Sequence, residues 1–328
     1  MKVRKMSILV IIYLVVIQVA LVSCNKEGSK EDSKNNIYLE KGSYIDPSSD
    51  KNIIYSYNGN KVKEIDKVIT NYNIESNSYL YYLNGYYYVY YKGKSIRLKA
   101  NKIYHPIFSP DGEYLLYLCK EKYILPKIYS LEKNKEIEMK NDAVISGEYI
   151  DWFSNGKLAY YGVNDNKEAG IYTYDIISGN EKLIYKINDG FVKYFKYVGN
   201  GIAFVKQYIN GNTTLKIINV DGNVIDVTEE IKEIYDIIAV ENVIYFLGKI
   251  KDNTYSLYSV KDNIVKKVVF DFPSNINIEK GLSYDKEGNI LFIGSNNNSE
   301  ENVYKYNRNN EISILSNISG NYNFININ

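Results

Sequence analysis

The chain has 328 residues, with 40 lysines and arginines against 39 aspartates and glutamates, and a formal net charge of +1. It contains no basic run of the kind that follows a phosphate backbone, which argues against a nucleic-acid partner. After residue 36 there is no long amphipathic helical pattern. Five prolines and many β-branched and aromatic residues favour an all-β fold.

Residues 1–23 have the organisation of an export signal. Three basic residues near the start precede an apolar stretch over 6–20, which is shorter than the ~20 residues that a membrane-spanning helix needs. Small Ser23 then precedes Cys24. The order of these parts predicts cleavage before Cys24. An uncleaved anchor helix, or an ordinary signal with a chance cysteine, is the alternative.

The motif Leu21-Val22-Ser23-Cys24 resembles the lipobox of bacterial lipoproteins. The resemblance implies that Cys24 becomes a diacylated or triacylated N-terminus, with the lipid transferred to its thiol. It also implies attachment to the outer face of the cytoplasmic membrane, or to the outer membrane of a diderm cell. Two or three acyl chains anchor a protein stably, whereas one gives only marginal binding. The membrane is therefore one expected partner, through the lipid on Cys24.

We expect residues 24–36 to consist of a lipidated cysteine followed by a flexible tether. No residue from Asn25 to Asn36 is apolar, so this segment cannot bury surface to offset its ordering entropy. At ~3.3 Å per residue its reach is at most ~40 Å. If Cys24 is lipidated, Cys119 has no intramolecular disulfide partner, and its apolar setting predicts a small buried side chain.

A repeating pattern over residues 37–328 predicts one β-propeller domain. An apolar-apolar-aromatic triplet recurs along this part, and its last five copies are spaced by 41 to 47 residues, a period typical of propeller blades. The triplets are Ile53-Ile54-Tyr55, Tyr86-Tyr87-Tyr88, Leu115-Leu116-Tyr117, Leu158-Ala159-Tyr160, Ile202-Ala203-Phe204, Val243-Ile244-Tyr245 and Ile290-Leu291-Phe292.

The pattern of each unit predicts four short antiparallel strands, because segments in which side-chain types alternate with a period of two are separated by Gly/Asn turns. One such sheet buries both faces only by packing against neighbours around a ring. The expected return strands include Glu136-Ile137-Glu138-Met139, Val224-Ile225-Asp226-Val227 and Ile312-Ser313-Ile314-Leu315.

Seven blades fit the chain best, over 37–66, 67–99, 100–141, 142–187, 188–229, 230–272 and 273–316. Residues 317–328 predict one further strand, which pairs with the first unit and closes the ring. Six or eight blades remain open because the first two units are short. A pair of β-sandwiches is the structural alternative, but it would not explain the period.

The sharpest motif in the repeat spans His105-Pro106-Ile107-Phe108-Ser109-Pro110-Asp111-Gly112-Glu113-Tyr114-Leu115-Leu116-Tyr117. It resembles the PD40/WD40-like repeat of TolB-type β-propellers. Its Ser-Pro-Asp-Gly step predicts a turn, because proline pre-sets φ, aspartate bonds the backbone two residues on, and glycine takes the left-handed position. The resemblance implies a scaffold that is used mostly for binding, with enzymes in the minority.

Candidate catalytic residues are few. His105, the single histidine, precedes a proline at the start of an expected inner strand, where packing is the usual role, and one imidazole is too few for a histidine zinc site. Asp151 and Asp236 fall near two inner strands, where a glycosidase would place its two acids, but no motif supports that role. The Asn164-Asp165-Asn166 run lacks the glycine and glutamate of an EF-hand loop. The sequence thus predicts no catalytic residue, metal site or cofactor.

Tyrosines cluster at Tyr81-Tyr82, Tyr86-Tyr87-Tyr88 and Tyr90-Tyr91, dense enough to occupy both faces of a hairpin. Packing between blades is the main interpretation, and an exposed tyrosine surface for a glycan or a protein is the other. Trp152, the only tryptophan, is expected in the core.

Loops that follow the second and fourth strands of each unit should share one rim. They include Val163–Ala169, Gln207–Asn212, Lys249–Asn253 and Ser295–Asn302. Such loops on a rigid scaffold commonly carry binding. The first hypothesis is a monomeric, non-enzymatic lipoprotein whose rim or funnel binds a protein, peptide or envelope polymer. The second is an envelope or extracellular carbohydrate-active enzyme with carboxylates in the channel, and the third is a structural spacer. Paired acids in the funnel would favour the enzyme.

Overall fold

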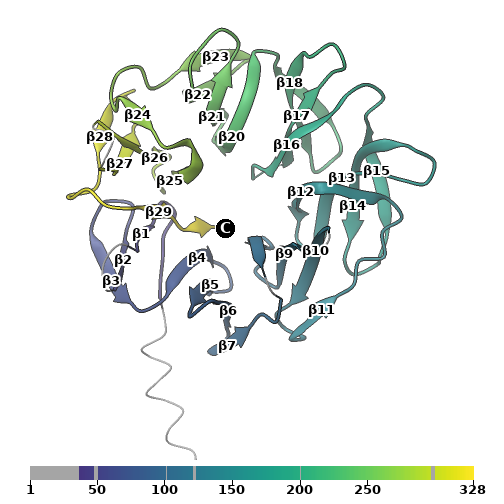
Figure 1. The fold of residues 1–328 in the computed structure, drawn as a ribbon, viewed down its shortest axis with the longest axis horizontal. Coiled ribbons are helices and arrows are strands. Elements are labelled where there is room, and N and C mark those ends of the chain that lie inside the picture. The colour runs from purple at the N-terminus through teal and green to yellow at the C-terminus, as the bar shows by residue number, and fades with distance from the viewer. Residues whose placement is uncertain (1–36, 48–50, 101, 121–122, 200, 297–299) are drawn as a thin grey trace, which may run out of the picture. The chain divides into compact units, whose positions relative to one another are not determined.

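The computed structural model describes residues 37–328 except 48–50, 101, 121–122, 200 and 297–299. The expected signal peptide, Cys24 and the tether lie outside the described residues. Leu39–Asn328 form a unit of seven antiparallel sheets around a central channel (Figure 1). No helix in the described ranges is long and apolar enough to cross a bilayer.

The strands divide among the blades as follows. The first blade contains β1 (Tyr44–Asp46), β2 (Asn52–Tyr55) and β3 (Lys61–Ile65), and the second β4 (Val68–Asn73), β5 (Ser78–Leu83), β6 (Tyr86–Tyr91) and β7 (Lys94–Arg97). The third contains β8 (Ile103–Phe108), β9 (Tyr114–Lys120), β10 (Ile124–Ser130) and β11 (Lys135–Ile137), and the fourth β12 (Val144–Ser154), β13 (Lys157–Val163), β14 (Ala169–Asp175) and β15 (Glu181–Lys186). The fifth contains β16 (Phe191–Tyr197), β17 (Gly201–Gln207), β18 (Thr213–Asn219) and β19 (Val224–Thr228), and the sixth β20 (Ile231–Val240), β21 (Val243–Ile250), β22 (Ser256–Lys261) and β23 (Ile264–Lys267). The seventh contains β24 (Asn275–Ile276), the 3₁₀ turn η1 (Ile278–Lys280), β25 (Leu282–Tyr284), β26 (Ile290–Ser295), β27 (Asn302–Tyr306) and β28 (Ile312–Ile314).

The last residues of the chain close the ring, as the sequence predicted. β29 (Asn323–Phe324) pairs antiparallel with β1 and becomes the innermost strand of the first blade. β30 (Asn326–Ile327) pairs in parallel with β4, so the same segment also joins the second blade. The seven-bladed, four-stranded antiparallel architecture is confirmed, and the closing segment contributes two strands rather than one.

The recurring triplet lies in the second strand of its blade in the fourth unit, where Leu158–Tyr160 belong to β13, but in the first two units it lies in the third strand. Tyr55 lies in the third strand of the first blade, because that blade takes its innermost strand from the other end of the chain. Tyr86–Tyr88 likewise lie in the third strand of the second blade, whose second strand is β5. In the sixth blade the aromatic residue that stacks on the third strand is Phe246 rather than Tyr245. Phe246 pairs with Tyr258 of that strand, and the two rings are stacked.

Five blades share one packing element, a stacked pair of aromatic rings from their second and third strands. The ring centroids lie 4.7 to 5.9 Å apart, within the range in which offset stacking stabilises beyond simple burial. The pairs are Tyr44–Tyr55, Tyr79–Tyr90, Tyr160–Tyr172, Phe246–Tyr258 and Phe292–Tyr304. Part of the tyrosine-rich composition therefore serves packing within the blades.

The predicted Ser-Pro-Asp-Gly turn forms between β8 and β9. Ser109 Oγ donates to Asp111 Oδ1 at 2.5 Å, and the Gly112 amide donates to the Ser109 carbonyl at 2.8 Å. Gly112 has a φ of +67°, and a Cβ there would lie 2.5 Å from Asn73 Oδ1. Asn73 of the second blade is fully buried and donates to the carbonyls of Ser109 and Pro110, so the turn also joins two blades.

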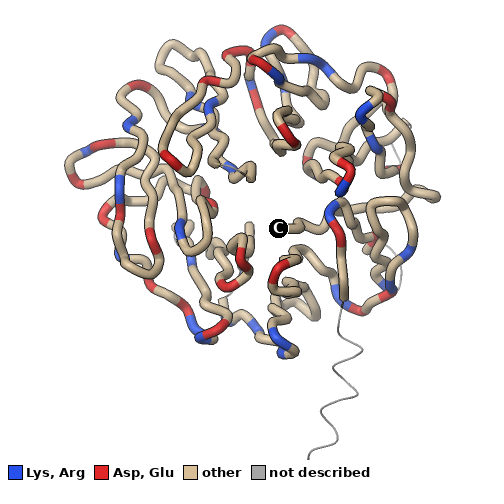
Figure 2. Tube along the Cα trace, turned by 180° about the vertical axis from the view of Figure 1, so that it is seen from behind, with Lys and Arg blue, Asp and Glu red and all other residues tan. Residues whose placement is uncertain are grey.

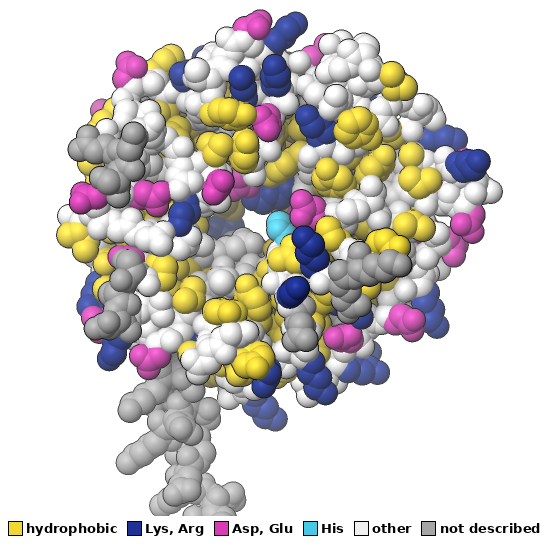
Figure 3. Space-filling model, in the orientation of Figure 1, with side chains coloured by type: hydrophobic (Ala, Val, Ile, Leu, Met, Phe, Trp, Pro, Cys, Tyr) yellow, Lys and Arg dark blue, Asp and Glu magenta, His cyan; other side chains and the backbone are white. Residues whose placement is uncertain are grey.

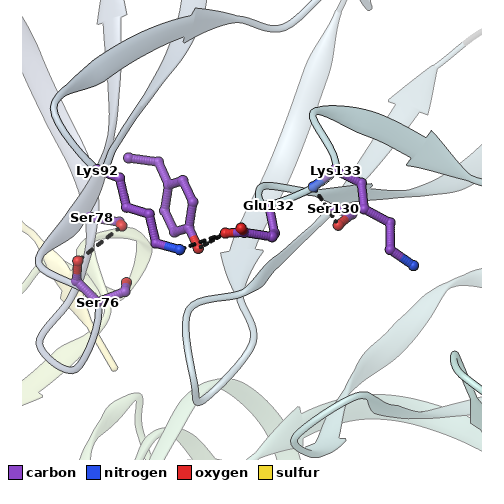
Figure 4. Close-up of polar contacts among 7 residues, drawn as sticks. Ser76, Ser78, Lys92, Ser130, Glu132 and Lys133 are labelled. Carbon is purple, nitrogen blue, oxygen red and sulfur yellow. Dashed lines mark hydrogen bonds and ion pairs between the residues drawn. The ribbon is translucent and has the colours of Figure 1, made fainter.

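Polar contacts join the outer turns of the second and third blades as well. Lys92 Nζ lies 2.5 Å from Glu132 Oε2, and the Tyr91 hydroxyl donates to the same oxygen at 3.2 Å (Figure 4). Both charged side chains are more than half exposed, so their attraction is screened by solvent and contributes little to stability. Cys119 and Trp152 are both buried, as the sequence predicted.

We expect Tyr322→Ala to lower the free energy of unfolding by about 4 kcal/mol, because the buried ring would leave a cavity. Tyr322 is 1% exposed and meets the Tyr44 and Tyr55 rings edge-on at the closure of the ring. Urea denaturation followed by circular dichroism measures the change. Ile318→Ala, which is 60% exposed in the same segment, is the control and should shift stability by less than about 0.5 kcal/mol. Equal effects of the two changes would contradict this role for Tyr322.

Candidate functional site

The inner strands that line the channel share a local irregularity. β4, β8, β12, β16 and β20 each shift register against their second strand, which is the signature of a β-bulge. A bulge re-aims the following side chains, and here it precedes the residues that reach the next blade. The channel chemistry therefore depends on what these bulged strands present.

Asp151 lies on β12, close to the channel as predicted, but it is engaged in a structural contact. Its carboxylate accepts the Trp152 amide at 2.7 Å and the Tyr197 amide of the neighbouring inner strand at 2.8 Å. The residue is 8% exposed. Burial raises the pKa of Asp151, while the two amides and the nearby positive charges of His105 and Lys196 act in the opposite direction.

Asp236 repeats this arrangement two blades further on. Its Oδ1 accepts the Ile237 amide at 2.8 Å, and its Oδ2 accepts the Leu282 amide of the next inner strand at 2.7 Å. Lys196 Nζ also lies 2.5 Å from Oδ1. Each of the two acids is held by two backbone N–H groups and joins two blades.

Side chains bridge other neighbouring inner strands in the same way. Asn71 Nδ2 donates to the Pro106 carbonyl at 2.8 Å, and Trp152 Nε1 donates to the Ile107 carbonyl at 3.2 Å. Lys280 Nζ, just before β25, donates to Asn323 Oδ1 of β29 at 2.9 Å. The polar groups around the channel are thereby used to hold neighbouring blades together.

The hydroxyl of Tyr194 lies among these channel charges. Burial raises the pKa of Tyr194 well above its usual range, and the negative charges of Asp236 and Asp151 act in the same direction. This tyrosine therefore stays protonated and serves as a hydrogen-bond donor.

His105 does not take the packing position expected for it. It lies in the bulge of β8 with φ at +53° and is exposed. The space-filling view shows the single histidine at the edge of the channel opening (Figure 3). Within the described ranges no three His, Cys, Asp or Glu side chains come together as metal ligands would. Asn164 closes a tight turn by accepting the Glu168 amide at 2.9 Å.

The loops after the second and fourth strands form one rim, here called the first rim. The tube view from behind shows lysines, arginines and acids interspersed along the outer turns, without a large field of one sign (Figure 2). Apolar side chains instead distinguish the first rim. Its exposed members are Tyr82, Tyr86, Tyr123, Leu125, Val144, Val163, Phe191, Ile209, Tyr255, Phe270 and Phe272.

Exposed apolar residues on the opposite rim are aliphatic. They include Ile177, Val220 and Ile264, which lie in or beside turns between third and fourth strands. Interfaces are enriched in aromatic residues relative to ordinary surface. The distribution of aromatic side chains therefore distinguishes the first rim from the opposite rim, and Figure 3 shows apolar side chains around the channel opening.

The tyrosine hairpin β5–β6 contributes to both packing and surface. Tyr82 and Tyr86 are 41% and 43% exposed, and Tyr82 meets the Tyr87 ring at 5.1 Å. Arg97 lies 3.5 Å over the Tyr86 ring. On the other face Lys67 lies over buried tyrosine rings, and burial, followed by the charge of Lys63, lowers the pKa of Lys67 to about 8. The two-faced hairpin is as predicted.

Sequence reasoning missed a groove of about 990 Å³ between the third and fourth blades. Tyr123 and the β10 residues 124–127 form one wall, and Val144, Ile145 and Gly147 form the other. The predicted return strand over 136–139 is wrong at its end. β11 stops at Ile137, so Glu138 and Met139 leave the sheet and line the groove.

No protein-family model matches the chain, and no curated protein matches it. Solved structures do. The β-propeller domain of the Trilobed protease from Pyrococcus furiosus matches with a TM-score of 0.58 and 13% identity over 84% of this chain and 94% of that one. An oligogalacturonate lyase from Vibrio parahaemolyticus matches with a TM-score of 0.52 and 13% identity over 85% of each chain.

These similarities show the β-propeller fold and nothing finer. The Pyrococcus domain has an open velcro topology, whereas β29 here completes the first sheet. TolB from Acinetobacter baumannii matches with a TM-score of 0.46 and 11% identity over 85% of this chain and 80% of that one. Similarity at this level does not distinguish a TolB-type propeller from any other.

We expect Asp151→Ala to lower the free energy of unfolding by about 3 kcal/mol, because two buried amides lose their acceptor. Chemical denaturation measures the loss. Asp165→Ala, at an exposed loop position, removes the same charge without a bridge and should change stability by less than about 0.5 kcal/mol. Unchanged stability of the Asp151 variant would reopen a catalytic role for this carboxylate.

Proposed function

We propose that this protein is an extracytoplasmic lipoprotein, attached to the membrane through Cys24, whose propeller binds protein or peptide partners on the first rim. The observation that carries the binding part is the concentration of exposed aromatic and aliphatic side chains on that rim. Tyrosine and phenylalanine offer large contact area at low entropy cost. The resemblance of residues 105–117 to TolB-type repeats also supports a scaffold that is used for binding.

The structure offers little for the rival hypothesis of a carbohydrate-active enzyme. A glycosidase needs two carboxyl groups flanking one bond, free to exchange protons with substrate. Asp151 and Asp236 lie two blades apart, and each accepts two backbone amides. The fold shared with a lyase and with a protease domain does not carry their activities to this chain, because function resides in the site rather than the fold.

The membrane anchor rests on the sequence motif at Leu21-Val22-Ser23-Cys24. Because residues 24–36 are polar throughout, a lipid at Cys24 would sit at one end of a hydrophilic spacer and the propeller at the other. The protein would then present its rim to partners in the envelope. We propose a monomer with no nucleic-acid partner, consistent with its near-neutral, mixed-sign surface.

We expect Cys24→Ser to abolish incorporation of an alkyne-bearing palmitate into the protein, because no thiol remains to accept the diacyl group. In-gel fluorescence after click labelling measures incorporation. Cys119→Ala is the matched control and should keep full labelling, since Cys119 is buried in the propeller. Persistent labelling of Cys24→Ser would refute the lipoprotein assignment.

The rim can be tested with residues 37–328, whose ring is closed by its own last strands. We expect this protein to retain a partner from detergent-solubilised envelope, and the double variant Ile209→Asp/Phe270→Asp to lose at least about 90% of it, because two charges would have to be desolvated at the contact. The control is Ile177→Asp/Ile264→Asp on the opposite rim, which should retain the partner fully. Quantitative mass spectrometry measures retention. Equal retention by both double variants, or turnover of a test glycan with no retained partner, would count against binding at the rim.

A further inference from the structure

We propose that the groove between the third and fourth blades binds an extended peptide, which pairs with the exposed edge of β10 and carries alternating apolar and basic side chains. This inference rests on the proposed binding function and names its site and the chemistry of its partner. It begins from the early end of β11. Only Ile128, Tyr129 and Ser130 of β10 have partners in that strand. Among the described residues, the remaining half of β10, Ile124–Lys127, pairs with a strand on one side alone.

The direction of the backbone groups follows from the strand's own geometry. The Leu131 amide donates to the Glu113 carbonyl, so residue 131 faces β9. Because the N–H and C=O groups of successive residues point to opposite edges, Ile128, Pro126 and Ile124 face the edge where β11 lies or would lie. Ile128 is paired there. The amide and carbonyl of Ile124 and the carbonyl of Pro126 have no partner among the described residues.

Proline at position 126 fits an exposed edge. It has no N–H to leave unpaired, and within sheets it is confined to edge strands or bulges. The edge therefore offers two carbonyl acceptors and one amide donor. An added antiparallel strand would use all three, in the manner of peptide recognition by strand addition.

The walls of the groove supply apolar contact. Leu125 on β10 and Val144 at the start of β12 are 40% and 72% exposed, and Ile137, Met139 and Ile145 are partly buried between them. The volume of about 990 Å³ is at the upper end of ordinary ligand pockets. Alternate side chains of an extended peptide would bury their apolar surface here, since they point to one face at every second residue.

The groove is held open before any partner arrives. The segment that crosses from β11 to β12 is fixed to the fourth blade, because the Asp142 and Ala143 amides donate to the Glu181 carboxylate at 3.0 and 3.2 Å. The Lys140 amide also donates to the Tyr174 hydroxyl at 3.1 Å. This segment cannot fold back to complete β11 without breaking these bonds, so the open edge is a built feature. A preformed site also loses less entropy on binding.

Charge and hydrogen bonding indicate a donor-rich partner. Glu138 is exposed on the groove and makes no hydrogen bond or ion pair with another described residue, whereas Lys127 already lies 3.6 Å from Glu136. With two carbonyls and a carboxylate against one amide donor, the groove complements the N–H groups of a peptide and a lysine or arginine side chain. A neutral glycan would leave the carboxylate without a counter-charge.

The test uses residues 37–328 of the protein. The probe is a fluorescein-labelled peptide of eight residues in which lysine and valine alternate. We expect binding by fluorescence polarisation, and slower hydrogen exchange of the Ile124 amide in the complex. Val144→Lys and Glu138→Lys should each raise Kd about tenfold, the effect of losing one good contact. Ile177→Lys, 84% exposed on the opposite rim, should leave Kd unchanged.

Two further probes separate strand pairing from unspecific attraction. One peptide carries N-methyl groups on all valine amides and the other on all lysine amides, so that each loses the donors of one edge. Strand addition requires one of them to bind at least about tenfold more weakly. A glutamate–valine peptide should also bind more weakly than the lysine–valine probe.

Three results would overturn the proposal: no binding of the lysine–valine probe at millimolar concentration, equal binding of both methylated peptides and the parent, or no effect of either groove variant. If a partner is still captured from the envelope and lost in Ile209→Asp/Phe270→Asp, only this inference fails and binding at the rim stands.

Discussion

The ring depends on side chains that reach from one inner strand to the backbone of the next. A four-stranded sheet cannot bury both of its faces alone, so every blade relies on its neighbours. At the centre of the ring the innermost strands of neighbouring blades do not pair with one another as strands of one sheet. The backbone N–H and C=O groups on their inner edges therefore have no partner within the sheet. Asp151 and Asp236 meet this need by accepting one amide from their own strand and one from the next. Removing such an acceptor would leave buried donors unpaired, which costs more than the bond itself contributes.

This constraint separates structure from function in the molecule. Acids, an indole N–H and an asparagine amide that might otherwise line a reactive funnel are committed to joining blades. The exposed surface that does not join blades lies on the first rim, where loops of differing length carry aromatic side chains. A rigid ring that presents adaptable loops is a common arrangement for recognition. The backbone amides thus occupy the two acids that were the candidates for a catalytic pair.

Periodicity predicted the fold well because each blade repeats one pattern of burial. The unit boundaries and the closing role of residues 317–328 followed from spacing and composition alone. The first blade was misread by one strand, since the pairing of Tyr44 with Phe324 joins opposite ends of the chain and leaves no local signal. The second blade was misread because its second and third strands, β5 and β6, are both rich in tyrosine. Asp151 and Asp236 were correctly placed near inner strands. Their partners, the amides of Tyr197 and Leu282, lie 46 residues away and could not be inferred from a single sequence.

The groove escaped prediction for a related reason, although one residue signalled it. Glu136–Met139 alternates like a strand, so local pattern extended β11 past Ile137, whereas the anchoring of Asp142 and Ala143 on the fourth blade pulls the chain away. Pro126 was the available clue, because proline within a sheet is confined to edge strands and bulges, and β10 includes Pro126 although the alternating sequence pattern begins only at Ile128. An open edge also invites self-association, and removing one donor from it limits pairing between copies of the chain. Pro126 thus leaves an edge that is too poor in donors for indiscriminate strand addition but retains the acceptors that a donor-rich peptide would use.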